Sequence, residues 1–387
     1  MLHSTKARLG RMCLALACAG LLCGACGGDK KGAAPEGKKE EPRKASVEKR
    51  DPVDVFLSSL DAFNTSNAAK LRDSFSQDAA WWGPCSLHGP IRGIREIMHS
   101  LTTFKGIVPD AKITVRRVLH RENMVVAQTV TVGTKKWSEH GTEETPKPLG
   151  FEGIYFVLTD PDGRARETLP YFDQAVMMRQ IGALSGEARP IPEPPTGQPE
   201  IADKAETDGI AEAAAAALTD LGKGCASLAP LVAPGFTYVD MKSGKKLDLA
   251  ALPAFLAGER QIDGGLAYTV QQTIGAGSFV AIRWEAAGRF PGKGNVGATD
   301  LVLHGAHVFT FEGNKILTVE AYESDFEYLQ KTGLIAEAVK GDDEDALGPR
   351  GKVPGTSDAQ AEDKIATPPA PPESHAAPVQ KPAAKTP

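Results

Sequence analysis

The sequence lacks a surplus of basic residues, a long apolar run in its main body and several familiar chemical signatures. Its 387 residues carry 44 Lys and Arg against 49 Asp and Glu, a net charge of -5. This balance offers no basic face, so nucleic acid is not an expected partner. No segment after residue 26 is apolar and long enough to span a bilayer. There is also no Gly-rich phosphate loop and no Ser in a G-x-S-x-G setting.

Metal ligation is not expected either. His304 and His307 lie three residues apart on an expected strand and therefore face opposite sides of it. The other histidines of the main body show no ligand spacing with Cys or carboxylate residues: His88, His99, His120 and His140. The sequence therefore predicts no metal site and no cofactor.

Cysteine is scarce where a disulfide framework would need it. Three of the six cysteines precede residue 24, which leaves Cys26, Cys85 and Cys225. One cysteine in each half of the main body is no disulfide framework. Cys85 and Cys225 are either a pair between the halves or two buried thiols, and we favour buried thiols.

The first 26 residues read as a leader. A positive stretch precedes the apolar run Met12–Cys23, and two small residues come directly before Cys26. This resembles a bacterial lipoprotein signal peptide, residues 1–26, with Cys26 as the lipidated residue. Cys23 departs from the Leu usual in that motif; Cys18 as the lipidated residue and an ordinary secretory leader are the alternatives. The resemblance implies a lipid-anchored protein of the bacterial cell envelope that faces the periplasm or the exterior.

Three segments look unable to form a core. Residues 27–50 have almost no large apolar side chain and mix charges of both signs, which is typical of a disordered tether. Residues 185–208 form a Pro-rich linker that we expect to be extended. Residues 339–387 turn acidic and then Pro/Ala-rich, and are expected to be a disordered tail.

The rest of the chain repeats itself. Leu149–Gly182 returns in a looser form as Val302–Gly333: a strand rich in aromatic and β-branched residues, a Gly-bearing turn, a second strand, an Asp and a short helix. Asp173 and Asp325 lie 152 positions apart. Such a separation exceeds any solenoid period and suits two copies of a whole domain. We therefore expect two modules, residues 51–184 and 209–338.

Each module should begin with helices and end with a meander of strands. The expected helices are 53–63, 68–75, 91–101 and 174–181, then 210–221, 228–232, 249–257 and 326–331. The expected strands are 79–82, 111–119, 123–134, 149–159 and 164–171, then 236–240, 267–274, 278–290, 300–311 and 316–322. This order excludes a doubly wound parallel sheet. It predicts an α+β fold in which a strongly curved, mostly antiparallel sheet wraps around three to four helices as a cone, with any pocket at the open mouth.

The element order, the helix Ile91–Met98, Pro109–Asp110 before the first long strand and the ending DGRARETLPYFDQAVMMRQIG are similar to the nuclear-transport-factor-2-like superfamily. The nearest branch is the SnoaL-like polyketide cyclases, and the ketosteroid isomerases are cousins. The resemblance covers about 51–184 and 210–336. This fold hosts enzymes, ligand binders and interaction modules, so the function must be argued from site residues.

The isomerase branch implies one set of candidates. There, a carboxylate base works with hydrogen-bond donors that stabilise an enolate. The base position matches Gly83 in module one and Asp240 in module two. The donor position matches Tyr155 in module one and His307 in module two. The resemblance therefore implies that module one has lost the catalytic set and that module two keeps part of it.

The cyclase branch implies another candidate. Its acid/base is an Asp at the end of the last strand, a position that Asp173 matches and Asp325 echoes more loosely. Acid–base work needs such a carboxyl to be partly desolvated. An Asp directly before a helix is also a good N-cap, and the sequence favours capping at both positions.

Aromatic residues near the expected mouths suggest a ligand. In the pairs Trp81-Trp82 and Tyr171-Phe172 one member should face inward, since a strand alternates. An aromatic lining suits a hydrophobic or ring-shaped ligand, although ordinary core packing explains it as well. The candidate ligand-binding residues are Trp82, Tyr155, Tyr171, Tyr238 and Trp284.

Three hypotheses follow. The first is a membrane-anchored, non-catalytic protein that binds an apolar small molecule in one cone or docks an envelope protein by a sheet face. The second is a cyclase-like or isomerase-like enzyme, which requires Asp173 or Asp240 to point into an enclosed pocket lined by such aromatics. The third is a structural component in which the two sheets pack on each other and leave no cavity.

Overall fold

The computed structural model describes residues 50–82, 90–137, 143–259 and 261–335. The expected leader with Cys26, the tether, Gly83, Cys85 and the C-terminal tail lie outside these residues. Within them, none of the helices combines the length and the apolar character that a membrane span requires.

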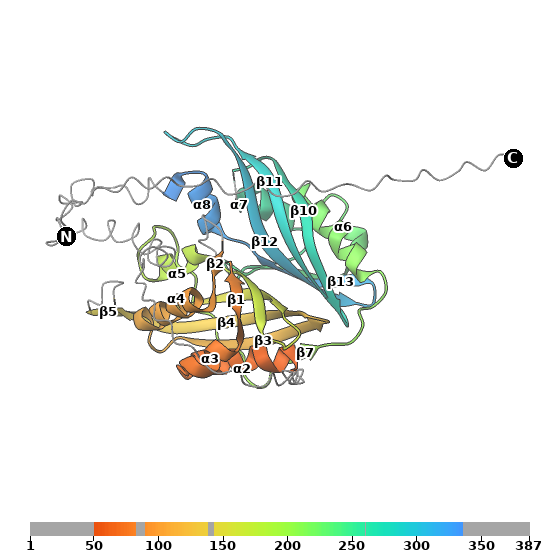
Figure 1. Ribbon diagram of the computed structural model, residues 1–387. Coiled ribbons are helices and arrows are strands. Elements are labelled where there is room, and N and C mark those ends of the chain that lie inside the picture. The colour runs from red at the N-terminus through yellow and green to blue at the C-terminus, as the bar shows by residue number, and fades with distance from the viewer. Residues whose placement is uncertain (1–49, 83–89, 138–142, 260, 336–387) are drawn as a thin grey trace, which may run out of the picture. The chain divides into compact units, whose positions relative to one another are not determined.

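Module one places helices on a seven-stranded sheet (Figure 1). Its helices are α2 (Pro52–Asn64), α3 (Ala68–Asp73), α4 (Ile94–Ile107) and α5 (Gln174–Gln180). Its strands are β1 (Phe75–Trp81), β2 (Ile91–Arg92), β3 (Lys112–Arg121), β4 (Met124–Trp137), β5 (Glu143–Thr159), β6 (Ala165–Tyr171) and β7 (Glu200–Ala202). The order is β2-β1-β6-β5-β4-β3-β7, antiparallel except for the pairs β1–β6 and β3–β7.

Module two repeats this plan without a counterpart of β7 among the described residues. Its helices are α6 (Ile210–Gly222), α7 (Leu252–Glu259) and α8 (Asp325–Lys331). Its strands are β8 (Val232–Asp240), β9 (Lys246–Leu247), β10 (Asp263–Ala276), β11 (Phe279–Phe290), β12 (Thr299–Glu312) and β13 (Lys315–Tyr322), in the order β10-β11-β12-β13-β8-β9. Only β13–β8 is parallel. The predicted α+β fold and the duplication are confirmed.

A local prediction was wrong. The helix expected over 228–232 is a single 3-10 turn, Ala229–Leu231, because Pro230 removes a backbone donor and β8 begins directly after it. The linker also contains a short strand that the sequence did not predict, since its residues Glu200–Ala202 pair with β3 as β7.

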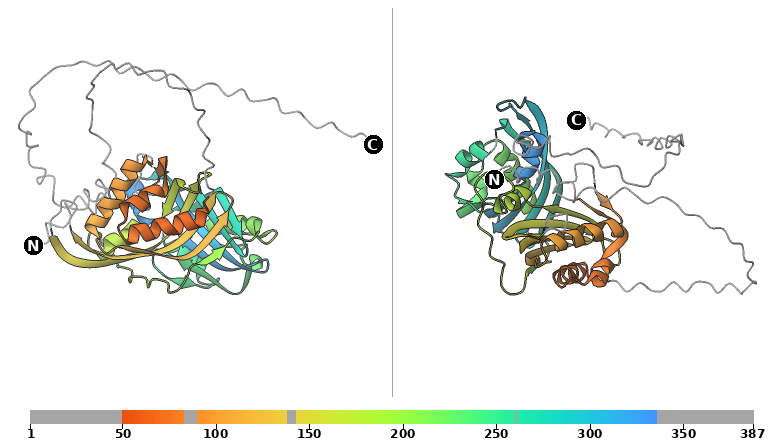
Figure 2. Two further views of the ribbon diagram at one scale, coloured as in Figure 1. Left: turned by 60° about the horizontal axis from the view of Figure 1, so that its bottom comes forward. Right: turned by 90° about the vertical axis from the view of Figure 1, so that its left-hand side faces the viewer.

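The first helix of each module packs on the concave face of its sheet. In α2 the Asp51 carboxylate accepts hydrogen bonds from the amides of Val53 and Asp54, and Pro52 occupies the first turn. Its buried side chains include Phe56 and Phe63. Figure 2 shows α2 lying across the sheet of module one.

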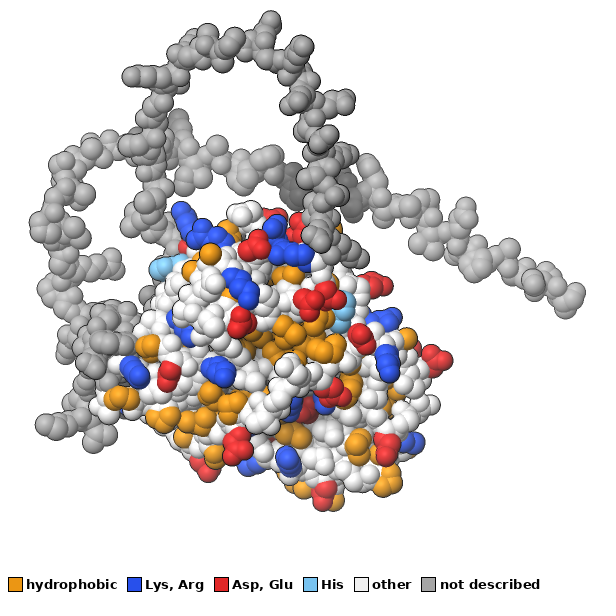
Figure 3. All heavy atoms as spheres, turned by 90° about the horizontal axis from the view of Figure 1, so that it is seen from below, with side chains coloured by type: hydrophobic (Ala, Val, Ile, Leu, Met, Phe, Trp, Pro, Cys, Tyr) orange, Lys and Arg blue, Asp and Glu red, His pale blue; other side chains and the backbone are white. Residues whose placement is uncertain are grey.

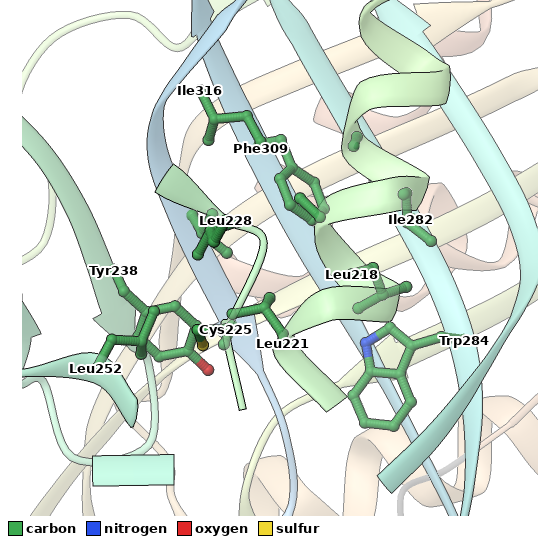
Figure 4. Close-up of a cluster of buried hydrophobic side chains, with 14 of the residues drawn as sticks. Leu218, Leu221, Cys225, Leu228, Tyr238, Leu252, Ile282, Trp284, Phe309 and Ile316 are labelled. Atoms are coloured by element: carbon green, nitrogen blue, oxygen red, sulfur yellow. The ribbon is translucent and has the colours of Figure 1, made fainter. Parts of the chain in front are cut away.

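The cone of module two is filled by side chains. Leu218 of α6 packs with Trp284 and Phe309 of the sheet, and all three are buried (Figure 4). Along β12 the odd-numbered residues Leu303 and Phe309 belong to this core. A buried aromatic core of this kind contributes several kcal/mol for each large side chain.

The two modules correspond residue by residue. Gly182 and Gly333 end the closing helices with left-handed φ values of 74° and 77°. Tyr171 and Tyr322 stand at the same distance before these glycines, each at the end of its last strand. The strand registers extend the correspondence to Ile154 and Ala306, Tyr155 and His307, Gln128 and Arg283, and Arg117 and Gln272.

The convex faces of the two sheets pack on each other. One buried cluster joins Val126 and Phe156 of module one to Ala306, Val308 and Tyr322 of module two. On β12, the even-numbered residues Ala306 and Val308 point away from the cone, as strand alternation requires. This is the sheet-on-sheet packing that the third hypothesis expected.

Gly305 tests how tightly the cone of module two is packed. A Cβ at this position would lie 2.3 Å from Cζ2 of Trp284 and 2.8 Å from the carbonyl oxygen of Tyr322. We expect Gly305→Ala to lower the free energy of unfolding by about 1–3 kcal/mol through overpacking. The equivalent Gly153 in module one has only ordinary contacts, at 3.4 Å or more. Gly153→Ala is therefore the matched control and should cost nothing in a urea titration; equal losses in both variants would contradict this packing.

Candidate functional site

Asp173 caps two helices at once. Its Oδ1 accepts hydrogen bonds from the amide of Ala175 in α5 and from the amide of Phe326 in α8, each at 3.0 Å. The hydroxyl of Ser324 lies 3.4 Å from the same oxygen. Ala175 and Phe326 are equivalent residues, so one carboxylate closes the first turn of the equivalent helix in each module. The capping interpretation of Asp173 is therefore correct, and the cap reaches across the module junction.

The true counterpart of Asp173 is Ser324, which is the N-cap of α8. The looser match of Asp173 to Asp325 was wrong by one residue. Asp325 is the first residue of α8, and its carboxylate pairs with Arg179 at 3.3 Å and with Lys242 at 3.2 Å.

The electrostatics of Asp173 resemble those of an acid–base group, but its location does not. The residue is only 3% exposed, and Oδ2 has no hydrogen-bond partner within the described residues. Burial, and then the nearby charge of Asp325, raise the pKa of Asp173 to about 6, against the opposing effect of the two amides and Lys242. The cavity beside it measures about 10 Å³, which is room for one water. An organic substrate does not fit there.

Lys242 is a buried charge that sequence reasoning missed. Its Nζ pairs with the carboxylates of Glu259 and Asp325, and the residue is 7% exposed. Its charge also opposes the raised pKa values of Asp173 and Asp240. In the sequence it stands in a turn beside Ser and two further lysines, MKSGKK, a pattern typical of exposed residues.

Asp240 lies at the end of β8 and is buried. Its Oδ2 accepts hydrogen bonds from the amide and the hydroxyl of Ser243 in the following turn. Burial raises the pKa of Asp240, and Lys242 opposes this shift most. The registers place Asp240 opposite Ala321 and Ala321 opposite His307, so both candidates share the concave face of the sheet, about 10 Å apart.

His307 is enclosed by aromatic rings. Its Nδ1 accepts a hydrogen bond from the indole Nε1 of Trp284 at 2.7 Å. The rings of Tyr238, Tyr268 and Phe309 lie with their centroids 6.1–6.3 Å from the imidazole. Because an accepting Nδ1 carries no proton, the neutral imidazole has its proton on Nε2.

Tyr238 and Trp284, two predicted ligand-binding residues, are core residues of module two. They are 2% and 1% exposed and pack in the core beside α6 (Figure 4). Their rings also lie next to the imidazole of His307. They fill the space that a ligand would need, so the structure favours the core interpretation for both.

Tyr155 holds the equivalent position in module one, but its surroundings are apolar. Its ring packs with Phe56 and, edge to face, with Trp81 at 6.1 Å. Burial raises the pKa of Tyr155 to about 12. Its hydroxyl is not among the buried polar atoms that lack a hydrogen-bond partner within the described residues. It is one polar group in an otherwise hydrophobic part of the cone.

The neighbouring tryptophans divide as strand alternation predicts, but the inward one is Trp81. Trp82 is 36% exposed, and its indole donates to Glu167 on the outer side. Its place in the predicted lining therefore belongs to Trp81, which contacts Tyr155. The sequence pattern requires opposite faces but does not say which residue takes which.

Tyr171 belongs to the module junction and not to a cone mouth. It packs edge to face on Phe156, and the nearby positive charge of Arg283 of module two favours the ionised form of its hydroxyl. Burial raises the pKa of Tyr171 to about 12. Its counterpart Tyr322 accepts hydrogen bonds from Gln128 at 2.8 Å and Arg116 at 3.0 Å. Since Gln128 corresponds to Arg283, the junction has the reciprocal contacts of a two-fold interface.

The other sequence candidates add little chemistry. Among the described residues no group of three or more His, Cys, Asp or Glu side chains could hold a metal ion. Cys225 is a free buried thiol, which agrees with the favoured interpretation, and burial raises its pKa to about 11.

The fold and these sites define a class: paired cones of curved sheet and helices, joined back to back, in which the cyclase-type Asp serves as a cap. The SnoaL-like domain family matches residues 57–168 and 213–319, together more than half of the chain. The chain therefore belongs to the SnoaL-like domain family and carries two copies of the domain.

Solved structures similar to this chain are one module long. IdmH, a putative polyketide cyclase from Streptomyces antibioticus, is 21% identical, with 34% of this chain and 99% of that one covered and a TM-score of 0.31. AclR, a putative hydroxylase from Streptomyces galilaeus, is 13% identical, with 35% of this chain and 97% of that one covered and a TM-score of 0.31. A putative SnoaL-like polyketide cyclase from Jannaschia sp. CCS1 is 15% identical, with 38% of this chain and 100% of that one covered and a TM-score of 0.31. No curated protein matches the chain.

Proposed function

We propose that this chain is a non-catalytic, lipid-anchored envelope protein whose first module binds an apolar, ring-shaped small molecule that carries one hydrogen-bond acceptor. Module two, with its filled cone, serves as the scaffold that module one packs on. The anchor is the lipid on Cys26, and the tether of residues 27–50 lets the paired modules stand off the membrane.

One observation carries the proposal. The ring of Tyr155 lies in a region formed by Phe56, Trp81 and aliphatic side chains, and its hydroxyl is a polar group in that region. A ligand with a carbonyl or ether oxygen accepts a hydrogen bond from this hydroxyl, which contributes about 0.5–1.5 kcal/mol. The rings of the ligand pack against the apolar side chains. Small-molecule sites commonly have this form, an apolar lining with few polar groups.

The same region lacks what catalysis needs. The position that the isomerase branch uses for its carboxylate base matches Gly83 in module one, and glycine has no side chain that could take a proton. Asp173, which the cyclase branch would use, has its Oδ1 engaged with two helix amides at the junction. We therefore assign module one to binding and not to proton transfer.

Module two offers the rival function, an isomerase-type enzyme that uses Asp240 and His307. In its favour, both residues lie on one concave face, and burial raises the pKa of Asp240. Against it, Asp240 is held by the turn at Ser243, and Trp284 and Tyr238 occupy the space between strands and helix. We regard these residues as a polar core that the fold has retained.

Binding of the fluorescent naphthyl ketone prodan tests the proposal. It is apolar, has two fused rings and carries one carbonyl acceptor. We expect Tyr155→Phe to weaken prodan binding about 3- to 10-fold, the effect of one neutral hydrogen bond. The control is Tyr171→Phe, which removes a hydroxyl near the charge of Arg283 at the junction and should leave the dissociation constant unchanged.

Two outcomes would contradict the proposal. One is equal weakening by both variants, since it would place the dye at the junction. The other is turnover of a β,γ-unsaturated ketosteroid that Asp240→Asn abolishes, because this would make module two an enzyme.

A further inference from the structure

Buried charge gathers in one place, the junction between the two modules. On the surface, basic and acidic side chains are interspersed, as the face in Figure 3 shows. At the junction, buried or half-buried charged side chains from both modules line a small cavity beside Asp173 or form ion pairs within the same group. They are Glu152, Arg179, Lys242, Glu259, Glu323 and Asp325. In the protein interior such charges are poorly screened, so each one acts on the protonation of the others.

The cavity is shared by the two modules. Its lining has polar and apolar side chains from each of them: Glu152, Asp173 and Val176 of module one, and Lys242, Tyr322 and Glu323 of module two. Its volume of about 10 Å³ has room for one water molecule. A buried water needs two or more polar partners, and the lining carboxylates and the lysine provide them. Because each module supplies part of the lining, the site exists only when the modules are packed together.

Asp173 has an unpaired oxygen at this cavity. Its Oδ1 accepts hydrogen bonds from the amides of Ala175 and Phe326. Its Oδ2 is buried and has no hydrogen-bond partner within the described residues. A buried polar atom without a partner is rare in native proteins, and an ordered water commonly satisfies such an atom. A water in the adjacent cavity is therefore the expected partner of Oδ2.

Carboxylates surround Asp173 on the elements packed around it. They are Asp325 of α8, Glu323 after β13, Glu152 of β5, Glu259 of α7 and Asp240 of β8. The other acid of α8, Glu327, is paired with His304 and Lys331. Ionisation of Asp173 therefore places a negative charge among other negative charges.

The cations of this group are paired with these carboxylates. Lys242 is shared by two of them, Arg179 pairs with Asp325, and Arg189 pairs with Glu152. A negative charge on the capping carboxylate adds to the surplus of negative charge that remains. A proton on its Oδ2 avoids this charge and leaves Oδ1 as the acceptor for both helix amides. Burial, and then Asp325, accordingly raise the pKa of this carboxyl to about 6.

The contact between α5 and α8 is small. Each helix has seven residues, and their shared apolar cluster consists of Ala175, Met178, Leu184 and Phe326. Helices this short are not stable alone, so they depend on their caps and on this packing. The two sheets are joined by a larger cluster of buried side chains. A charge at the shared cap therefore loosens the helix pair before it separates the sheets.

We propose that the junction cavity binds one water molecule and one proton, and that this site controls how tightly α5 and α8 are held together. The proton lies on Oδ2 of Asp173 and is donated to the water, which donates its own hydrogens to Glu152 and Glu323. When the proton leaves, the charge on Asp173 repels Asp325, and the two helices separate locally while the sheets stay packed. This inference is independent of the small-molecule site in module one, because it uses only the module junction.

Amide hydrogen exchange of the full-length mature chain at pH 5 and pH 7.5 tests the proposal. After correction for the intrinsic pH dependence of exchange, protection over residues 174–181 and 325–332 should fall about 10-fold between these pH values. This factor follows from an acid whose pKa is about 6 when the helices are closed and 3.8 when they are open.

Guanidinium below the unfolding transition distinguishes local opening from global unfolding. A local opening exposes little surface, so the exchange of α5 and α8 should not depend on the denaturant. The exchange of β4 and β12 should accelerate with it, because these strands exchange through larger openings.

Asp173→Asn removes the titratable proton and keeps both caps, and its side-chain NH₂ group donates to the water. Its two helices should have the same protection at pH 5 and pH 7.5. Ser324→Ala is the matched control, since it removes the side-chain cap of α8 but no titratable group. Its helices should be less protected at both pH values and keep the fall of about 10-fold.

A high-resolution crystal structure of the chain at pH 5 tests the water directly. It should show one water within hydrogen-bond distance of Oδ2 of Asp173. Three results would overturn the inference. They are an undiminished pH response in Asp173→Asn, helix exchange that accelerates with guanidinium as strand exchange does, and a junction cavity that side chains fill without a water.

Discussion

Between pH 4 and pH 7 the wild-type protein should lose stability that the Asp173→Asn variant keeps. The folded-state pKa of Asp173 is about 6, above the ordinary value of 3.8. For an acid with a raised pKa the contribution to stability is fully present below pH 3.8 and is lost as the pH rises through 6. The shift corresponds to on the order of 2–3 kcal/mol across that window.

The Asn variant keeps the caps without the charge. Its side-chain oxygen still accepts from Ala175 and Phe326, so its free energy of unfolding should change less with pH than that of the wild type. Asp173→Ala should be about 2 kcal/mol less stable than Asp173→Asn at every pH, because both helix amides lose their acceptor. Guanidinium titrations at pH 4, 5, 6 and 7 measure these differences.

Ser324→Ala is the matched control at the same junction. It removes the side-chain cap of α8 but no titratable group. It should lower stability by about 1 kcal/mol and keep the wild-type pH slope. Asp240, whose pKa burial also raises, contributes to all variants alike and cancels in the comparison. A full wild-type slope in Asp173→Asn would show that Asp173 does not carry the effect.

The second large effect should follow from Glu320→Ala. Glu320 of β13 pairs with Arg116 at 2.7 Å and accepts a 2.6 Å hydrogen bond from Gln128, both in module one. Its side chain is 10% exposed. Removing one member of a fully buried ion pair costs about 3–5 kcal/mol, because the other charge is left uncompensated. The side chain of Arg116 is 33% exposed, so water compensates part of its charge. We therefore expect a loss of about 2 kcal/mol.

The lost contacts are those between the two modules. The Glu320→Ala variant should therefore also unfold in two steps, where the wild type unfolds in one. Differential scanning calorimetry and denaturant titration measure this change. Glu320→Gln keeps the shape and one acceptor, so its stability should lie between those of the wild type and Glu320→Ala. Glu312→Ala, an exposed glutamate of the neighbouring β12, should shift stability by less than about 0.5 kcal/mol. Similar losses for Glu320→Ala and Glu312→Ala would mean that the junction network contributes little.

The candidate site illustrates how far residue patterns lead. The sequence identified Asp173 both as a candidate acid/base and as a candidate N-cap, because an Asp between a strand and a short helix is a recognisable position. Its second helix was not foreseeable, since Phe326 is 153 residues away and meets Asp173 only when the modules pack. The mistaken match of Asp173 to Asp325 has a similar cause: identical letters were aligned, while the structure aligns the capping positions.

The buried charges were the least accessible feature. Lys242 and Glu320 are ordinary charged residues in the sequence, and nothing near them marks burial. They are buried because the modules pack on each other, through contacts between residues far apart in the chain. The same contacts move Tyr171 from a predicted cone mouth to the junction.

The amino-acid sequence by itself determined the two α+β modules, most of their strands and helices, and the residues that could carry chemistry. Local periodicity, turn residues and an internal repeat carry that information, because each acts over a few residues or compares like with like. Only the tertiary structure decided that the convex sheet faces meet, that Asp173 joins two helices and that the linker pairs with β3 as β7. These features depend on burial and pairing between segments that are far apart in the chain. Alternation along a strand shows that neighbouring residues take opposite faces, but it does not show which face is buried.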